Sequence, residues 1–160
     1  MAKKQSQVPS FAGAVVVGVD GRDTTQAALL WAAAEAARRK ARLVVMTVQE
    51  AHTNALAFGA GVDEVTAITD ADTDVRARTA AEAAREAFPG LKVSTMRPEG
   101  QPARRLIKAS KSAALVVVGR HGRHKQAYAA LGTTASTTAM HATCPVVIVR
   151  HRHAGEASLS

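Results

Sequence analysis

Apolar residues gather in five short runs along the chain, and the segments between these runs carry helical patterns. The run at 14–20 is continuously apolar until it ends in Asp20, which is typical of a strand buried on both faces of a parallel sheet. Residues 91–97 alternate apolar and polar side chains, which predicts a strand that is wet on one face and lies at a sheet edge. Strands are therefore predicted at residues 14–20, 42–48, 91–97, 114–118 and 145–149.

Four helices are predicted between these strands. The first begins at Asp23 and Gln26, which are spaced as a capping box, and it runs to about Lys40. Basic residues at its end complement the negative end of the helix dipole. The fourth helix is short and runs from about Gly132 to Ala142.

The second and third helices are identified by apolar residues spaced by three or four. The second follows a loop at 50–63 and is stopped by Pro89 and Gly90. The third opens near Pro102, since proline is favoured in the first turn of a helix. Their expected apolar stripes are Val65, Ile68, Ala71, Val75, Thr79, Ala83 and Ala87 in the second helix, and Ala103, Leu106, Ile107 and Ser110 in the third.

The strict alternation of strands and helices predicts an α/β fold. Right-handed βαβ units build a parallel sheet with helices on both faces, so we expect a single-domain, Rossmann-like sandwich. Residues 1–12 and 151–160 are expected to form a flexible arm and a flexible tail. Ligands of such folds bind beyond the carboxyl ends of the strands, where the strand order switches. Asp20, the segment after Val48 and the loop at 119–134 follow such ends, so they are expected to converge on one crevice.

The loop after the fourth predicted strand has the composition of a phosphate cradle. Its glycines are spaced Gly119-x2-Gly122-x9-Gly132, and Thr133 follows. Glycine lets the backbone approach a ligand closely, and the N–H groups at the start of the next helix favour phosphate. His121 and its basic neighbours add positive or switchable charge. An ordinary strand-to-helix loop with turn glycines would look similar, and the closing Gly-Lys-Ser/Thr of a Walker A motif is missing.

Charge and composition narrow the classes of function. The 160-residue chain has a net charge of +8, which raises nucleic acid as a partner. Its basic residues are scattered and no aromatic platform accompanies them, so we rank this hypothesis last. Cys144 is the single cysteine, which suits a reducing compartment, and no apolar run matches a signal peptide or a membrane span. The histidines lack metal-ligand spacing. We therefore expect a cytoplasmic protein without a metal site of its own.

The loop spacing and the strand beyond it resemble the universal stress protein family. The shared pattern is Gly-x2-Gly-x9-Gly-Thr, a helix, and then CPVVIV at 144–149. The stretches VVVGVDGRDTTQAALLWAAAEA at 15–36 and GQPARRLIKASKSAALVVVG at 100–119 are also similar to the family. The resemblance covers about residues 13–150. It implies the strand order 3-2-1-4-5 and, for members with this loop motif, binding of ATP, with any Mg²⁺ carried by the nucleotide.

The resemblance also implies roles for individual residues. The end of the first strand would meet the nucleoside, and the end of the second would hold adenine through its backbone. The end of the fourth strand would lie against the ribose and phosphates, and the glycine loop and the next helix would bind the phosphates. The residues are Gly18, Val19 and Asp20 at the end of the first strand, Val48 at the end of the second, and Val118 and Gly119 at the end of the fourth. In the glycine loop and the next helix they are His121, Gly122, Gly132, Thr133 and Thr134.

Three positions depart from the family pattern. Arg22 and Arg120 stand where the family often has Ser, and Ala114 stands where it usually has Asp. The two arginines would either strengthen phosphate binding or partly fill the pocket.

The resemblance implies an ATP-binding regulatory protein of the stress response, which acts by a nucleotide-dependent change of conformation or partner. An enzyme that slowly hydrolyses ATP or transfers adenylyl groups is the alternative. No convincing general base or Walker B carboxylate accompanies the loop, which favours binding over catalysis. Cyclic AMP is a further alternative ligand, because some family members prefer it.

The last predicted strand raises the question of self-association. The implied strand order places it at a sheet edge, where an apolar run would be exposed and adhesive. Pairing with the same strand of a second copy would give an isologous homodimer. The residues of this expected interface are Val146, Val147, Ile148 and Val149.

Overall fold

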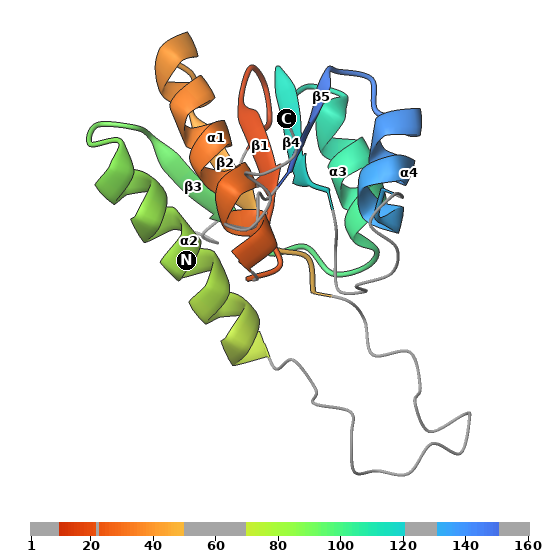
Figure 1. Ribbon diagram of the computed structural model, residues 1–160, viewed down its shortest axis with the longest axis horizontal. Helices are drawn as coiled ribbons and strands as arrows, with labels where there is room; N and C mark the ends of the chain where they lie inside the picture. Colours follow the sequence, from red (N-terminus) through yellow and green to blue (C-terminus); the bar gives the residue numbers. More distant parts are fainter. Residues whose placement is uncertain (1–9, 22, 50–69, 121–130, 151–160) are drawn as a thin grey trace, which may run out of the picture.

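The computed structural model describes residues 10–21, 23–49, 70–120 and 131–150. Within these ranges five strands and four helices alternate along the chain (Figure 1). The strands are β1 (Val15–Gly18), β2 (Leu43–Met46), β3 (Val93–Met96), β4 (Leu115–Gly119) and β5 (Val146–Val149). The helices are α1 (Asp23–Arg39), α2 (Asp70–Ala87), α3 (Pro102–Ser110) and α4 (Thr133–His141).

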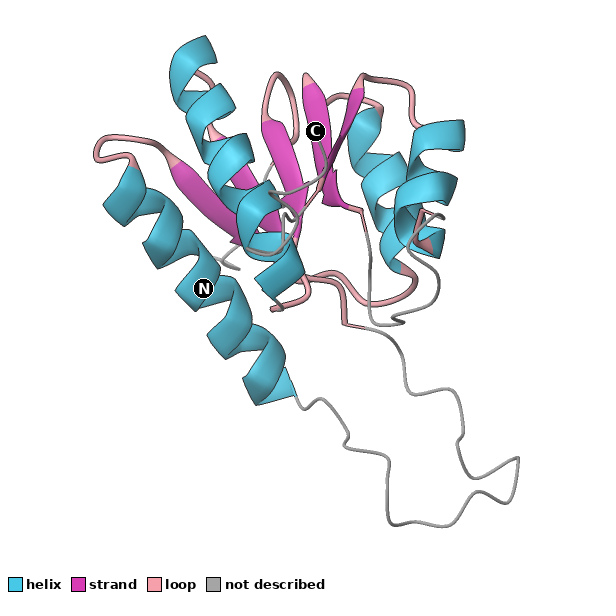
Figure 2. Ribbon diagram, viewed as in Figure 1, coloured by secondary structure: helices cyan, strands magenta, loops and turns pink. Residues whose placement is uncertain are grey.

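All the strands pair in parallel in one sheet with the order β3-β2-β1-β4-β5. β1 lies in the middle, where Val16 pairs with Val44 on one side and with Val116 on the other. Helices α1 and α2 cover one face of the sheet, and α3 and α4 cover the other (Figure 2). The predicted α/β class and the strand order 3-2-1-4-5 are therefore confirmed.

The continuous apolar runs are explained by two separate hydrophobic layers. Val15 and Val17 of β1 point into the layer beneath α1 and α2, whereas Val16 points into the layer beneath α3 and α4. Because successive side chains of a strand alternate between its faces, a strand buried on both faces must be apolar at every position. Alanines such as Ala32 and Ala36 on α1 are fully buried and let this helix approach the sheet closely.

The sequence-predicted stripe of α2 is wrong in phase. Val75 is 60% exposed, and the buried face is instead Thr73, Ala77, Ala81 and Ala84. Val65 and Ile68 of the expected stripe lie outside the described residues. The physical reason is that α2 is rich in alanine, so several of its faces are equally apolar. The predicted stripe followed Val75, which is the larger apolar side chain but lies on the exposed face. Small side chains fit the close contact of α2 with α1 and the sheet.

Helix α3 and strand β3 also differ in detail from expectation. Leu106 and Ser110 are buried as predicted, but Ala109 takes the third buried position of α3. β3 lies at the sheet edge as predicted, yet neither of its faces is fully wet. Val93 contacts the layer beneath α1 and α2, and Met96 contacts the opposite layer. The helices on both faces therefore extend partial cover to the edge strand.

Helix α1 ends in a left-handed turn. Lys40 has φ 53°, its N–H donates to the carbonyl of Ala37 at 3.1 Å, and the N–H of Ala41 donates to the carbonyl of Ala36 at 2.9 Å. This is the Schellman pattern, in which glycine is the usual left-handed residue. Lysine therefore holds a strained backbone position at this helix end.

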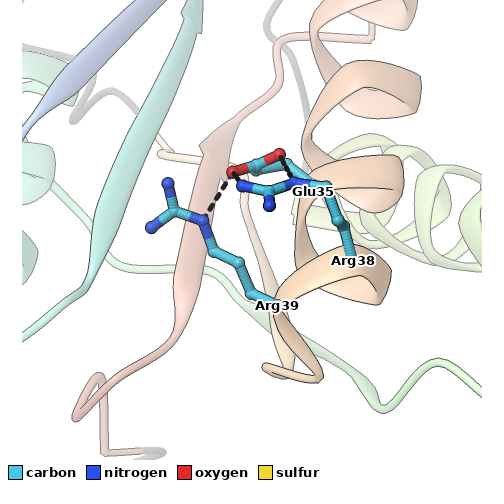
Figure 3. A network of polar contacts seen from close by, with 3 residues as sticks. All are labelled: Glu35, Arg38 and Arg39. Atoms are coloured by element: carbon cyan, nitrogen blue, oxygen red, sulfur yellow. Dashed lines mark hydrogen bonds and ion pairs between the residues drawn. The ribbon is translucent and has the colours of Figure 1, made fainter.

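The basic residues before this turn are paired within the helix. Glu35 accepts hydrogen bonds from Arg38 at 2.9 and 2.7 Å and from Arg39 at 2.6 Å (Figure 3). These hydrogen bonds lower the pKa of Glu35 from 4.5 to about 2. The two arginines thus serve the helix itself, in addition to complementing its dipole.

Candidate functional site

Pairing in the sheet continues past the carboxyl ends of β1, β2 and β4. The N–H of Val19 donates to the carbonyl of Met46 at 3.0 Å, and the N–H of Thr47 donates to that of Met96 at 2.9 Å. In the other half of the sheet, at β4 and β5, the N–H of Arg120 donates to the carbonyl of Val149 at 3.0 Å. We call this edge, formed by residues 18–21, 47–49 and 118–120 with the start of α4, the carboxyl edge. The strand order reverses here between β1 and β4, which is where ligands of such folds bind.

The turn from β1 to α1 is held from two sides. The hydroxyl of Thr25 donates to the carboxylate of Asp20 at 3.2 Å, which ties the turn to α1. Arg76 of α2 donates from Nη1 to the backbone carbonyl of Asp20 at 3.1 Å. Gly21 has φ +79°, and a Cβ at this position would lie 2.6 Å from Cδ of Arg76. Only glycine satisfies both the backbone angle and the close approach of the arginine.

Arg76 is a residue of this edge that the sequence analysis did not predict. No local motif identifies it, since it lies 56 positions from Asp20 along the chain. Its position at the edge depends on the rotation of α2, which the sequence pattern assigned wrongly. Thr25 carried a weak signal, because hydroxyl residues are common near helix starts.

The two ends of the glycine loop are joined directly. The N–H of Gly132 donates to the carbonyl of Arg120 at 2.9 Å, which places the start of α4 beside the end of β4. Helical hydrogen bonding begins when the N–H of Ser136 donates to the carbonyl of Gly132 at 2.9 Å. The N–H groups of Thr133, Thr134 and Ala135 therefore precede the first helical donor, Ser136, and carry the positive end of the helix dipole. Such a helix start is suited to an anion.

Gly18 has a packing role that is independent of any ligand. A Cβ at Gly18 would lie 3.2 Å from Cδ1 of Leu106 on α3. The absence of a side chain at this position allows α3 to pack against the end of β1. The side chain of Val118 is likewise in the core, only 3% exposed, so its backbone is the part left to face a ligand.

A buried hydroxyl follows β2 at the same edge. Thr47 is 3% exposed, and its Oγ1 has no hydrogen-bond partner among the described residues. An unpaired buried hydroxyl costs about 1–3 kcal/mol, so such a group is usually satisfied by water or by a ligand. Val48 comes next, and its side chain packs into the layer beneath α3 and α4.

The structure thus brings most of the predicted site residues to one edge. Gly18, Val19 and Asp20 end β1, and Val48 follows β2. Val118 and Gly119 end β4, and Gly132, Thr133 and Thr134 begin α4. His121, Gly122 and Arg22 lie outside the described residues. Across the part of the chain that the structure describes, no three His, Cys, Asp or Glu side chains gather as they would around a metal ion.

The sheet order and the carboxyl edge together define a Rossmann-like α/β protein with an anion-compatible helix start at its switch point. The model of the Universal stress protein family matches residues 13–150. The chain belongs to this family. None of the described helices has the length and apolar character needed to span a membrane.

Individual relatives and structures agree with the family. The chain is 39% identical over 141 residues to the universal stress protein Rv2028c of Mycobacterium tuberculosis, a match that covers 86% of this chain and 48% of the relative. The chain therefore spans about half the length of this relative. A universal stress protein solved in complex with cAMP is 25% identical, with a TM-score of 0.67 and coverage of 88% and 98% of the two chains. The universal stress protein UspA from Lactobacillus plantarum is also 25% identical, with a TM-score of 0.63 and coverage of 89% and 99%.

Proposed function

We propose that this protein binds an adenine nucleotide, ATP, at the carboxyl edge and acts as a regulatory protein of the stress response. The occupied and empty states would differ in conformation or in choice of partner. The observation that carries the proposal is the hydrogen bond from Gly132 to Arg120, since it brings the start of α4 to the switch point of the sheet. The similar structure with bound cAMP supports an adenine nucleotide as the ligand class.

The described residues fit such a ligand. The N–H groups at the start of α4 and the hydroxyl of Thr133 would donate hydrogen bonds to phosphate oxygens, with Arg120 nearby as a cation. Asp20 and the backbone of Gly18 and Val19 would meet the nucleoside. The unpaired hydroxyl of Thr47 offers one more polar group on this edge.

The remaining roles are carried by backbone atoms and by the glycine loop. Val48 would hold adenine through its backbone, and Val118 and Gly119 would lie against the ribose and phosphates. His121, Gly122 and Thr134 would contribute to the phosphate side. Any Mg²⁺ would enter with the nucleotide and would offset the negative charge of its phosphates.

Calorimetric titration of the full chain with ATP and Mg²⁺, and separately with cyclic AMP, tests the ligand. We expect ATP to bind more tightly, because a polyphosphate gains more from the helix start and the basic loop than a single phosphodiester charge does. Mass spectrometry of ligand released from protein purified without added nucleotide identifies the species bound in the cell. The absence of saturable heat with either nucleotide would refute the site. Multiple turnovers of ATP in a steady-state assay would instead favour the hydrolase alternative.

We also propose that two copies pair through β5 in the cytoplasm. β5 is an outer strand of the sheet, and its residues are only partly buried. Met140 on helix α4, which contacts β5, is 77% exposed. Light scattering after size exclusion at low micromolar concentration should give twice the chain mass. A particle of 16.7 kDa would contradict the proposal.

A further inference from the structure

Two adjoining hollows lie at the end of the sheet opposite to the carboxyl edge. The first, about 460 Å³, lies at the outer side of β3 and is lined by Arg42, Arg85, Leu91, Lys92, Val93 and Ser94. The second, about 520 Å³, runs between the end of α1 and the turn from α2 to β3. They share Arg42, Leu91 and Lys92, so together they form one continuous surface, which we call the basic hollow.

The basic hollow has an unbalanced charge. Its cations are Lys40, Arg42, Arg85 and Lys92, and none of the residues lining it is a carboxylate. The ion pairs between described residues involve other arginines, so none of these four cations has a carboxylate partner among the residues described. Like charges held close together repel one another, and a bound anion would relieve that repulsion.

Part of this cation cluster is already held in place. Nη2 of Arg85 donates to the backbone carbonyl of Val93 at 2.9 Å, which fixes the guanidinium beside the free edge of β3. Its remaining N–H groups are suited to a phosphate, which arginine binds through two parallel hydrogen bonds.

The second hollow also carries apolar side chains. Ala37, Ala41, Phe88 and Leu91 line the second hollow beside the cations. Small-molecule sites commonly combine apolar walls with a few polar groups. The surface therefore offers cations to a phosphate and apolar side chains to an organic group.

We propose that the basic hollow is a second ligand site, which takes the phosphate monoester of a small organic molecule. The phosphate lies among Arg42, Arg85 and Lys92, and the organic group lies against Leu91 and Phe88. The site is at the opposite end of the strands from the nucleotide edge, so it does not depend on the proposed function.

The test uses phenyl phosphate as the probe and the amide NMR spectrum of the full chain as the readout. We expect saturable shifts of the amides of residues 91–94, and phosphate alone to bind more weakly than phenyl phosphate. Amides of residues 132–134 report the carboxyl edge separately. Shifts confined to those amides, or no saturable shift at millimolar probe, would overturn the proposal. Equal binding of phosphate and phenyl phosphate would remove the organic part of it.

Matched variants assign the effect to these cations. Arg42→Gln should weaken the binding of phenyl phosphate by about tenfold, as expected for the loss of one charged hydrogen bond. Arg104→Gln removes an exposed cation on α3 that lines neither hollow, and it should change affinity by less than about twofold. An equal loss in both variants would mean only general attraction to a basic protein. Lys92→Gln repeats the test independently if Arg42→Gln lowers the thermal stability.

Discussion

The clamp between Arg76 and the turn at Gly21 makes a quantitative prediction. Replacing Gly21 with alanine places a Cβ where φ is +79° and 2.6 Å from Cδ of Arg76. The left-handed backbone costs about 1 kcal/mol. The displaced arginine loses its hydrogen bond to the carbonyl of Asp20, which costs about 1 kcal/mol more. The stiffer unfolded chain of the alanine variant offsets about 0.5 kcal/mol.

The expected net loss for Gly21→Ala is about 1.5 kcal/mol, which lowers the Tm by about 3–6 °C for a chain of this size. Urea denaturation followed by circular dichroism measures this loss as a change in midpoint at constant slope. Arg76→Met keeps most of the packing volume and removes the hydrogen bond, so it should cost about 1 kcal/mol.

The double variant distinguishes this explanation from simple backbone strain. Once Arg76 is gone, the alanine no longer displaces a hydrogen bond, so the double variant should lose about 1.5 kcal/mol in place of the additive 2.5 or so. The two changes are thus expected to couple by about 1 kcal/mol. Losses that add to within about 0.5 kcal/mol would show that Gly21 and Arg76 act separately, and the reasoning would be refuted.

Three further outcomes are expected. Lys40→Gly should stabilise the protein by about 0.5 kcal/mol in urea denaturation. Glycine relieves the left-handed strain at the end of α1, but it loses more backbone entropy on folding, which offsets part of the gain. Lys111→Gly, at a right-handed helix end, is the control and should not stabilise the protein. Gly132→Phe should weaken ATP binding at least about tenfold in calorimetry, since φ −61° allows a side chain but the ring would cover the helix start. The control is Ala139→Phe, on the exposed side of α4. Equal affinities of the two variants for ATP would exclude Gly132 from the site. Glu35→Gln tests the pKa of about 2: the folded-state pKa is depressed, so the stabilisation is present above pH 4.5 and lost as pH falls towards 2. The Tm difference between this variant and the wild type should therefore shrink across that range, and a constant difference would exclude the ion pairs as its source.

The fold was largely predictable because its signals are local. Val15 and its neighbours form a continuous apolar run, which indicates a strand covered on both faces, and the alternation of such runs with helices restricts the connections to right-handed crossovers. The start of α4 was equally local, since Gly132 followed by Thr133 has the composition of a helix start after a turn.

The parts that were missed depend on contacts between distant segments. Alanine fills several faces of α2, so periodicity alone could not choose the face that packs against α1. The position of Arg76 depends on which face of α2 is buried. Its contact with Asp20 therefore could not be predicted from the sequence either. Gly18 shows the reverse case, because a residue assigned to a ligand by its position is also needed for the packing of Leu106.

The two outer strands of the sheet differ in a way that bears on how far assembly can proceed. At β3, Arg85 occupies the outward carbonyl of Val93, so an incoming strand would have to displace a charged side chain. At β5 the partly buried apolar strand carries the proposed contact between copies. Once β5 is paired with a partner and β3 is occupied by Arg85, the sheet has no free edge strand for a further copy. Growth into fibres would require two open edges, so the contact of Arg85 with Val93 would limit the proposed self-association through β5 to a pair.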